Sequence, residues 1–188
     1  MNHRLDSLKR FYKKKRRLPS YSEMLQLFGV NSKNSIFKII KLFVEEGFIK
    51  KESGKLSPTS KFFQLPLLGL VKAGFPILAE EDKKYITLDD YLIGDPVSSF
   101  LLTVSGDSLM DLGIFEGDIV IVERRKNAQT GDIVLAEIDR SWTLKIFRKD
   151  KTTGKPYLIA ANAKYPPFYP REELIIHGVI KALVRKIH

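Results

Sequence analysis

A serine that follows a short apolar run is the residue of this chain best suited to nucleophilic chemistry. Residues 100–104 are apolar and lead into Ser105-Gly106-Asp107-Ser108. A tight turn here would expose the Ser108 hydroxyl and nearby backbone N–H groups to a cleft, which suits a nucleophile with an oxyanion site beside it. On the local sequence alone an ordinary solvated turn is the better explanation, because short motifs are weak signals.

The spacing of the histidines does not suggest that one of them is the base that would activate this serine. His3, His177 and His188 have no partners at the spacing of a triad or a metal site, and the chain contains no cysteine. Disulfides, zinc fingers and thiol catalysis are thereby excluded, and we expect no metal and no cofactor.

Lys145 is the alternative base. In the strand-like run 142–147, alternation places Thr143, Lys145 and Phe147 on one face. Burial of that face would disfavour the ammonium form and lower the pKa of Lys145, so that its neutral amine could accept a proton from a serine. The competing interpretation is an exposed lysine at a sheet edge, which is the commoner arrangement.

The elements that would position these two side chains are short β-rich runs separated by Gly, Asp and Asn turns. Such runs predict a mostly antiparallel β domain. The expected strands are 100–104, 118–122, 132–138, 142–147, 157–160 and 175–184.

The net positive charge of the chain is confined to its first third. Of the 188 residues, 1–61 hold 15 Lys/Arg against 5 Asp/Glu, whereas 62–188 hold 17 of each. This asymmetry indicates a small polyanion-binding module joined to a neutral domain with another purpose. No segment approaches the roughly 18 apolar residues of a membrane span, and the N-terminus lacks an apolar signal core, so we expect a cytoplasmic protein without membrane attachment.

Helical spacing of apolar residues predicts three helices in the basic module. They cover 5–15, a short segment that Ser20 or Ser22 caps and that ends at Phe28, and a segment capped by Ser32 that reaches Glu46. The second and third are joined by a short glycine turn, which is the pattern of a helix-turn-helix. The residues expected to face a DNA major groove are Ser32, Lys33, Asn34, Ser35 and Lys38.

Two short lysine-bearing strands, 48–52 and 55–57, then surround Ser53-Gly54. They predict a hairpin wing along the sugar-phosphate backbone, and hence a winged helix that binds double-stranded DNA. The competing interpretation is a helical domain whose charged face is merely solvated.

An apolar, extended segment over 65–78 follows a polar linker at 57–61. Pro66 and Pro76 restrict its ends to non-helical conformations. In its middle lies Ala73-Gly74, whose small side chains would let the peptide bond enter a narrow cleft. An Ala-Gly turn at the end of a strand is the simpler alternative.

Together these motifs resemble the LexA repressor family, whose C-terminal domain is shared with UmuD-type proteins and self-cleaving phage repressors. The resemblance covers nearly the whole chain and is strongest over 66–148. It rests on the order of the winged helix, Ala73-Gly74, Ser105–Ser108, Asp111, Gly113-Ile114, Glu116-Gly117-Asp118 and Thr143-Leu144-Lys145.

The resemblance implies an α+β chain of two domains. A winged helix-turn-helix covers 1–61, a linker with the cleavage site covers 62–80, and a β domain of the LexA/signal-peptidase type covers 81–188. Ser108 would be the nucleophile and Lys145 the general base, acting in cis on the Ala73–Gly74 bond. The implied partners are operator DNA, a second copy of the chain in a homodimer, and a RecA filament on single-stranded DNA as the trigger of cleavage in the SOS response.

Two departures from the family pattern stand out. Leu109 follows the nucleophile where methionine is usual, and a similar-sized apolar replacement preserves packing, so this change bears on the rate of cleavage rather than on cleavage itself. Phe37 and Lys38 stand where the best-known members carry acidic residues, so their operator sequence does not transfer to this chain.

Three other functions are compatible with parts of the pattern. A phage-type repressor whose C-terminal domain only dimerises would share the fold without cleavage. A processing peptidase acting in trans would share the Ser/Lys chemistry, but it would have a membrane anchor and no winged helix. A UmuD-like polymerase accessory would lack residues 1–61.

Overall fold

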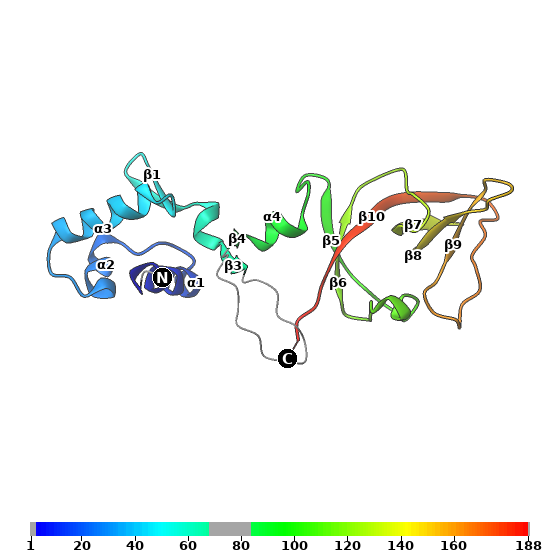
Figure 1. The fold of residues 1–188 in the computed structure, drawn as a ribbon, viewed down its shortest axis with the longest axis horizontal. Coiled ribbons are helices and arrows are strands. Elements are labelled where there is room, and N and C mark those ends of the chain that lie inside the picture. The colour runs from blue at the N-terminus through cyan, green and yellow to red at the C-terminus, as the bar shows by residue number, and fades with distance from the viewer. Residues whose placement is uncertain (1–2, 68–83, 188) are drawn as a thin grey trace. The chain divides into compact units, whose positions relative to one another are not determined.

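The computed structural model describes residues 3–67 and 84–187, and the chain divides into two compact units, Met1–Leu88 and Asp89–His188 (Figure 1). The first contains helices and two small hairpins, and the second contains one large antiparallel sheet. The chain is therefore a mixed α and β protein with a large antiparallel sheet, as the sequence predicts.

Three helices open the first unit: α1 (His3–Lys15), α2 (Tyr21–Phe28) and α3 (Lys33–Glu45). Each lies within two residues of its predicted bounds. Their apolar faces meet in one core, in which Leu8, Met24, Ile36 and Phe43 are almost completely buried. The helices thus owe their stability to a shared apolar interior.

The caps of α2 and α3 explain where these helices begin and end. Ser20, rather than Ser22, caps α2 in a capping box with Glu23, and Gly29 ends the helix in the left-handed conformation at φ 63°. Ser32 caps α3 as expected, because its hydroxyl accepts the backbone N–H of Ser35 at 3.2 Å.

Two hairpins complete the first unit. Strands β1 (Ile49–Glu52) and β2 (Lys55–Pro58) pair around Ser53-Gly54, and both turn residues have positive φ, as a two-residue hairpin turn requires. A 3₁₀ turn, Ser60–Phe63, buries Phe62 in the helical core. Strand β3 (Leu65–Leu67) then pairs with β4 (Lys84–Ile86).

The pairing of β3 with β4 also explains where the units divide. It keeps residues on both sides of the 68–83 segment in the first unit, so the division falls after Leu88, within the short helix α4 (Leu88–Leu92). The functional boundaries at 61 and 80 remain a prediction.

Six strands form the sheet of the second unit in the order β5-β6-β10-β7-β8-β9, with antiparallel neighbours throughout. All six overlap the predicted runs. They are β5 (Ser99–Thr103), β6 (Ile119–Glu123), β7 (Ile133–Ile138), β8 (Ser141–Lys149), β9 (Pro156–Ile159) and β10 (Leu174–Val184).

Strand β10 joins the two halves of this sheet. Residues 179–184 pair with β6, and residues 174–179 pair with β7. Its register shifts twice, between Ile176 and Gly178 and between Ile180 and Ala182. Such irregularities bend a strand and increase its twist, and here they lie where β10 passes from one partner to the other.

Two apolar clusters hold the elements that carry the candidate nucleophile and base. One contains Leu109, from the segment after β5, together with residues of β6, β7 and β8. The other contains Phe147 of β8, two residues beyond Lys145, packed with Leu158 of β9. In the part of the chain that the structure describes, none of the helices has the length and apolar character needed to cross a membrane.

Candidate active site

The segment that carries Ser108 is anchored at both ends. Where β5 ends, the backbone N–H of Val104 donates to Asp118 O at 2.8 Å, and Val104 O accepts the N–H of Gly117 at 2.9 Å. Gly106 lies at φ 87°, which favours glycine, and the Leu109 side chain is buried at 2% exposure. The conformation before Ser108 thus depends on the glycine at 106, and the buried Leu109 side chain holds the segment after it.

The Lys145 amine reaches Ser108 from β8. Its Nζ lies 2.9 Å from Ser108 Oγ, 2.7 Å from Thr143 Oγ1 and 3.1 Å from Leu144 O. Thr143 and Lys145 share a face of β8, as alternation predicts. The lysine is only 8% exposed, so the alternative of a solvated lysine at a sheet edge is wrong.

Burial lowers the pKa of Lys145, because the ammonium form loses hydration. The charge of Asp107 acts in the opposite direction and raises this pKa. Burial dominates, so the neutral amine becomes available at lower pH than for a solvated lysine. A neutral amine at 2.9 Å can accept the hydroxyl proton of Ser108, which is what activation of a serine nucleophile requires.

A second segment, which the sequence analysis did not identify, holds the Ser108 segment from the other side. The N–H of Ala161 donates to Ser108 O at 2.8 Å, and Asn162 Nδ2 donates to Asp107 O at 3.0 Å. The Tyr165 hydroxyl donates to the Asp107 carboxylate and lowers its pKa, so Asp107 is an anion at neutral pH. Asn162 is buried, and its side-chain amide holds the backbone of Asp107 in place.

An ion pair between the exposed Arg185 and the buried Asp118 carboxylate closes the far end of the segment. Arg185, just after β10, donates through Nε to Asp118 Oδ1 at 2.6 Å and also bonds Gly113 O. Asp118 Oδ2 accepts the N–H of Phe115 at 2.8 Å. The hydrogen bond from Arg185 is the main cause that lowers the pKa of Asp118 to about 2. Asp118, the last residue of the Glu116-Gly117-Asp118 motif, thus connects the Ser108 segment to the end of β10 through Arg185.

Ser108 and Lys145 open onto a cleft of about 230 Å³. Its apolar walls include Leu102, Leu135 and Trp142, which also line a larger neighbouring hollow of about 1100 Å³. The two depressions therefore adjoin at these three residues, and the smaller one has room for a peptide bond beside Ser108. The predicted bond, Ala73–Gly74, lies outside the described residues.

The five residues predicted to meet DNA lie at the start of α3. Lys33, Asn34 and Lys38 are exposed. The hydroxyls of Ser32 and Ser35 lie 2.8 Å apart, and Ser32 also caps the helix, so these two serines are engaged with the helix itself. The three longer side chains are the ones free to reach outward.

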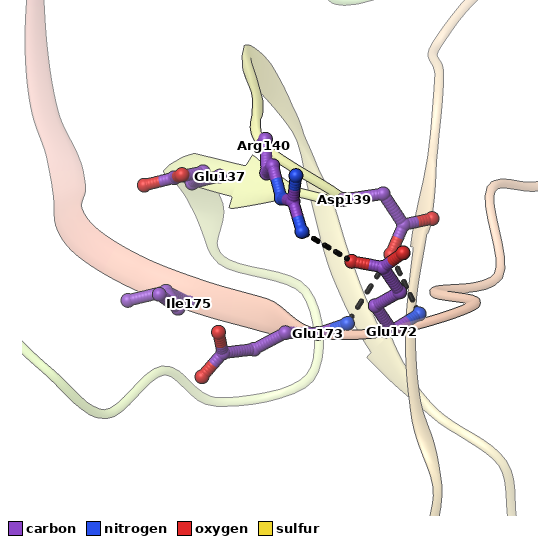
Figure 2. A pocket seen from close by; sticks show the side chains of 6 residues that line it. All are labelled: Glu137, Asp139, Arg140, Glu172, Glu173 and Ile175. Carbon is purple, nitrogen blue, oxygen red and sulfur yellow. Dashed lines mark hydrogen bonds and ion pairs between the residues drawn. The ribbon is translucent and has the colours of Figure 1, made fainter.

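Another pocket, at the turn between β7 and β8, is acidic but structural. Figure 2 shows Arg140 facing Glu172, with which it forms an ion pair at 3.4 Å, while the Asp139 carboxylate accepts the backbone N–H groups of Glu172 and Glu173. Asp139 and Arg140 both have positive φ, as a two-residue turn demands. Among residues 3–67 and 84–187, no group of three or more His, Asp or Glu side chains is placed to hold a metal ion.

Known proteins resemble this chain over most of its length. Residues 66–181 match the Peptidase S24-like family. A LexA repressor of Pelotomaculum thermopropionicum is 33% identical over 195 residues, which cover 98% of this chain and 94% of the relative. The chain belongs to the LexA repressor family.

LexA repressors of Opitutus terrae (34% identical; 88% of this chain, 86% of the relative) and Clostridium botulinum (36% identical; 71% of each chain) are further members. The Peptidase S24-like match includes Ser108 and Lys145, so the candidate site of this LexA family member lies in its peptidase part.

Proposed function

We propose that the chain is a transcriptional repressor of DNA-damage (SOS) response genes that binds operator DNA as a dimer and inactivates itself by cleaving its own Ala73–Gly74 bond. The observation that carries the proposal is the 2.9 Å contact between Lys145 Nζ and Ser108 Oγ, within a cleft of a LexA family member. Ser108 is the nucleophile and Lys145 the general base of a serine endopeptidase.

In the proposed reaction the neutral Lys145 amine takes the hydroxyl proton as Ser108 Oγ attacks the carbonyl carbon of Ala73. The tetrahedral intermediate collapses, the bond to Gly74 breaks, and the Gly74 amine leaves with the proton carried by Lys145. Water then hydrolyses the acyl-serine and restores both side chains. The Thr143 hydroxyl and Leu144 O, at 2.7 and 3.1 Å from Nζ, orient the amine.

A substrate bond in the same chain makes a modest catalyst sufficient. High effective concentration replaces much of the binding that a peptidase acting in trans needs. The same tether allows control, because cleavage is prevented whenever the linker stays out of the cleft. A RecA filament on single-stranded DNA is the proposed trigger that favours the engaged state.

The proposed DNA-binding part is a winged helix formed by α1 to α3 and the β1–β2 hairpin. The concentration of Lys and Arg in residues 1–61, and the exposed Lys33, Asn34 and Lys38 on α3, support it. The three similar proteins, all LexA repressors, support the same function. Lys50, Lys51 and Lys55 on the hairpin are exposed and suit contact with phosphates.

The proposed dimer forms through the second unit, with residues 179–184 of β10 as the expected interface. These residues pair with β6 on one edge, whereas the pairing with β7 ends at Val179. Leu183 and Val184 are exposed apolar residues of this segment. Cleavage between 73 and 74 would separate the DNA-binding part from this dimer, and a two-fold operator would be bound far less tightly by separate halves.

The experiment that tests the function measures operator binding before and after self-cleavage. The full-length protein selects duplexes from a random pool, and binding is measured at several salt concentrations. We expect steep salt dependence from phosphate neutralisation, and loss of binding after incubation at alkaline pH. Ser108→Ala protein, treated identically, should keep its affinity.

Two outcomes would contradict the proposal in different ways. Wild-type protein that stays intact and bound after the alkaline incubation would identify a non-cleaving, phage-type repressor whose second unit only dimerises. Failure to select any duplex would overturn the DNA-binding function.

A further inference from the structure

Phe37 is an aromatic side chain on the outer face of α3, and 50% of its surface is exposed. The inward face of α3 is already filled by Ile36, Ile39, Ile40 and Phe43. The exposed ring of Phe37 is therefore not part of the core of the first unit. Because fully burying a Phe side chain is worth about 1.5–3 kcal/mol, covering this exposed half against another molecule would be favourable.

The ring has a defined support on one side. It lies 5.2 Å from the ring of Tyr21, the first residue of α2, at an interplanar angle of 45°. This contact restrains Phe37 without covering it. Phe37 also borders a shallow hollow of about 360 Å³ whose walls include Lys41 and Lys51.

Polar and basic residues surround the exposed half of the ring. Lys33 and Asn34 precede Phe37 by one helical turn, and Lys41 follows it by one turn, so all three neighbour it on the helix surface. The centres of protein–protein interfaces are depleted in lysine. The major groove of DNA instead combines phosphates along its walls with apolar thymine methyl groups on its floor.

We propose that Phe37 is a specificity-determining residue that packs against the C5-methyl group of a thymine in the operator. Among the four base pairs, only those with thymine present a methyl group in the major groove, so an apolar ring at this place favours thymine over cytosine. The inference rests on the proposed DNA-binding function and adds a base contact to it. Because Phe carries no hydrogen-bonding group, the contact works through the methyl group alone.

The test removes that methyl group from the DNA and leaves the base pairing unchanged. In a duplex selected by the wild-type protein, each thymine is replaced singly by deoxyuridine, and affinities are measured at one salt concentration. We expect wild-type affinity to fall about threefold to fivefold at one thymine of each half-site, as for the loss of one buried methyl group. Phe37→Ala protein should bind both duplexes equally, and Phe37→Leu should keep part of the preference.

Leu42→Ala provides the matched control. Leu42 is another exposed apolar residue of α3, at 42%, and it points to a different side of the helix. This variant should retain the full response to deoxyuridine.

The outcomes separate this contact from the function on which it rests. If wild-type protein binds the selected duplex but responds to no single deoxyuridine, or if Phe37→Ala responds as wild type does, the methyl contact is wrong while DNA binding stands. If Phe37→Ala protein does not bind DNA, the test uses Phe37→Leu protein. A loss of affinity on deoxyuridine substitution as large as that of wild type would also contradict the proposal. If wild-type protein binds no duplex, both proposals fail.

Discussion

At the scale of single residues, the environment of Lys145 turns an ordinary strand lysine into a candidate base. Its amine has three hydrogen-bond partners, and the Phe168 ring lies 5.3 Å from Nζ. Burial disfavours the charged amine more than Asp107 favours it, so the pKa of Lys145 is lowered. In the proposed reaction the rate of self-cleavage rises with pH as this amine loses its proton.

The opposing effect of Asp107 gives a prediction about that pH dependence. The negative charge raises the pKa of Lys145, so Asp107→Asn should lower the pKa further and shift the midpoint of the rate–pH curve of self-cleavage to lower pH. Asparagine can still accept the Tyr165 hydroxyl, which limits other changes to the segment. The measurement is the first-order rate of self-cleavage over a series of buffers.

Asp111→Asn is the control for this shift. It removes the same charge from the same segment, but Asp107 is the carboxylate whose charge acts on Lys145. We expect its midpoint to match that of wild type. A midpoint that moves upward in Asp107→Asn protein, or that does not move, would contradict the electrostatic account.

Ser108 and Lys145 were candidates from the sequence because several motifs occur in the order of the LexA repressor family. Each local pattern alone favoured an ordinary turn or an exposed lysine. Asn162, Tyr165 and Arg185 could not be found in this way. Their hydrogen bonds span 55, 58 and 67 residues of sequence, and nothing near them records the partner. The pair that would do the chemistry was predictable, whereas the residues that hold it in place required the fold.

At the scale of elements, turn and cap residues made most boundaries predictable. Ser32 caps α3 and Ser53-Gly54 forms the β1–β2 turn, as expected from their sequence preferences. The short elements β4 and α4 were missed, because three to five residues show no reliable periodicity. The central place of β10 was also unforeseen, since alternation reveals a strand but not its neighbours.

Gly178 in β10 gives a prediction at this scale. A Cβ atom added here would lie 2.5 Å from Val122 Cγ1 and 2.8 Å from Glu123 O, so β10 and β6 would have to move apart. We expect Gly178→Ala to reduce the free energy of unfolding by about 1–3 kcal/mol, as overpacking does. Urea denaturation, followed by circular dichroism, measures the change.

Gly94→Ala is the matched control, because, apart from its own residue and chain neighbours, no described atom lies within 4 Å of its added Cβ. This variant should be as stable as wild type or slightly more stable. Equal stability of Gly178→Ala and Gly94→Ala would show that the contact between β10 and β6 tolerates a methyl group, contrary to the packing described.

At the scale of the whole molecule, the distribution of charge and the extent of the peptidase family match both change within residues 61–66. The net positive charge lies within residues 1–61, and the peptidase family match begins at residue 66. The boundary expected at residue 61, where charge and hydrophobic period both change, stays a prediction, because the compact units divide after Leu88. In the proposed function the two parts depend on one covalent linker, so a single cut is enough to end repression.

The central claim is that Ser108 and Lys145 cut the chain that carries them, and mass spectrometry of the protein after alkaline incubation tests it most directly. The account predicts two fragments from wild-type protein, separated between Ala73 and Gly74. It also predicts that Ser108→Ala and Lys145→Met slow cleavage by roughly a hundredfold or more, since each removes one partner of the proton transfer. Cleavage of either variant at the wild-type rate, or wild-type protein that remains a single chain, would contradict it.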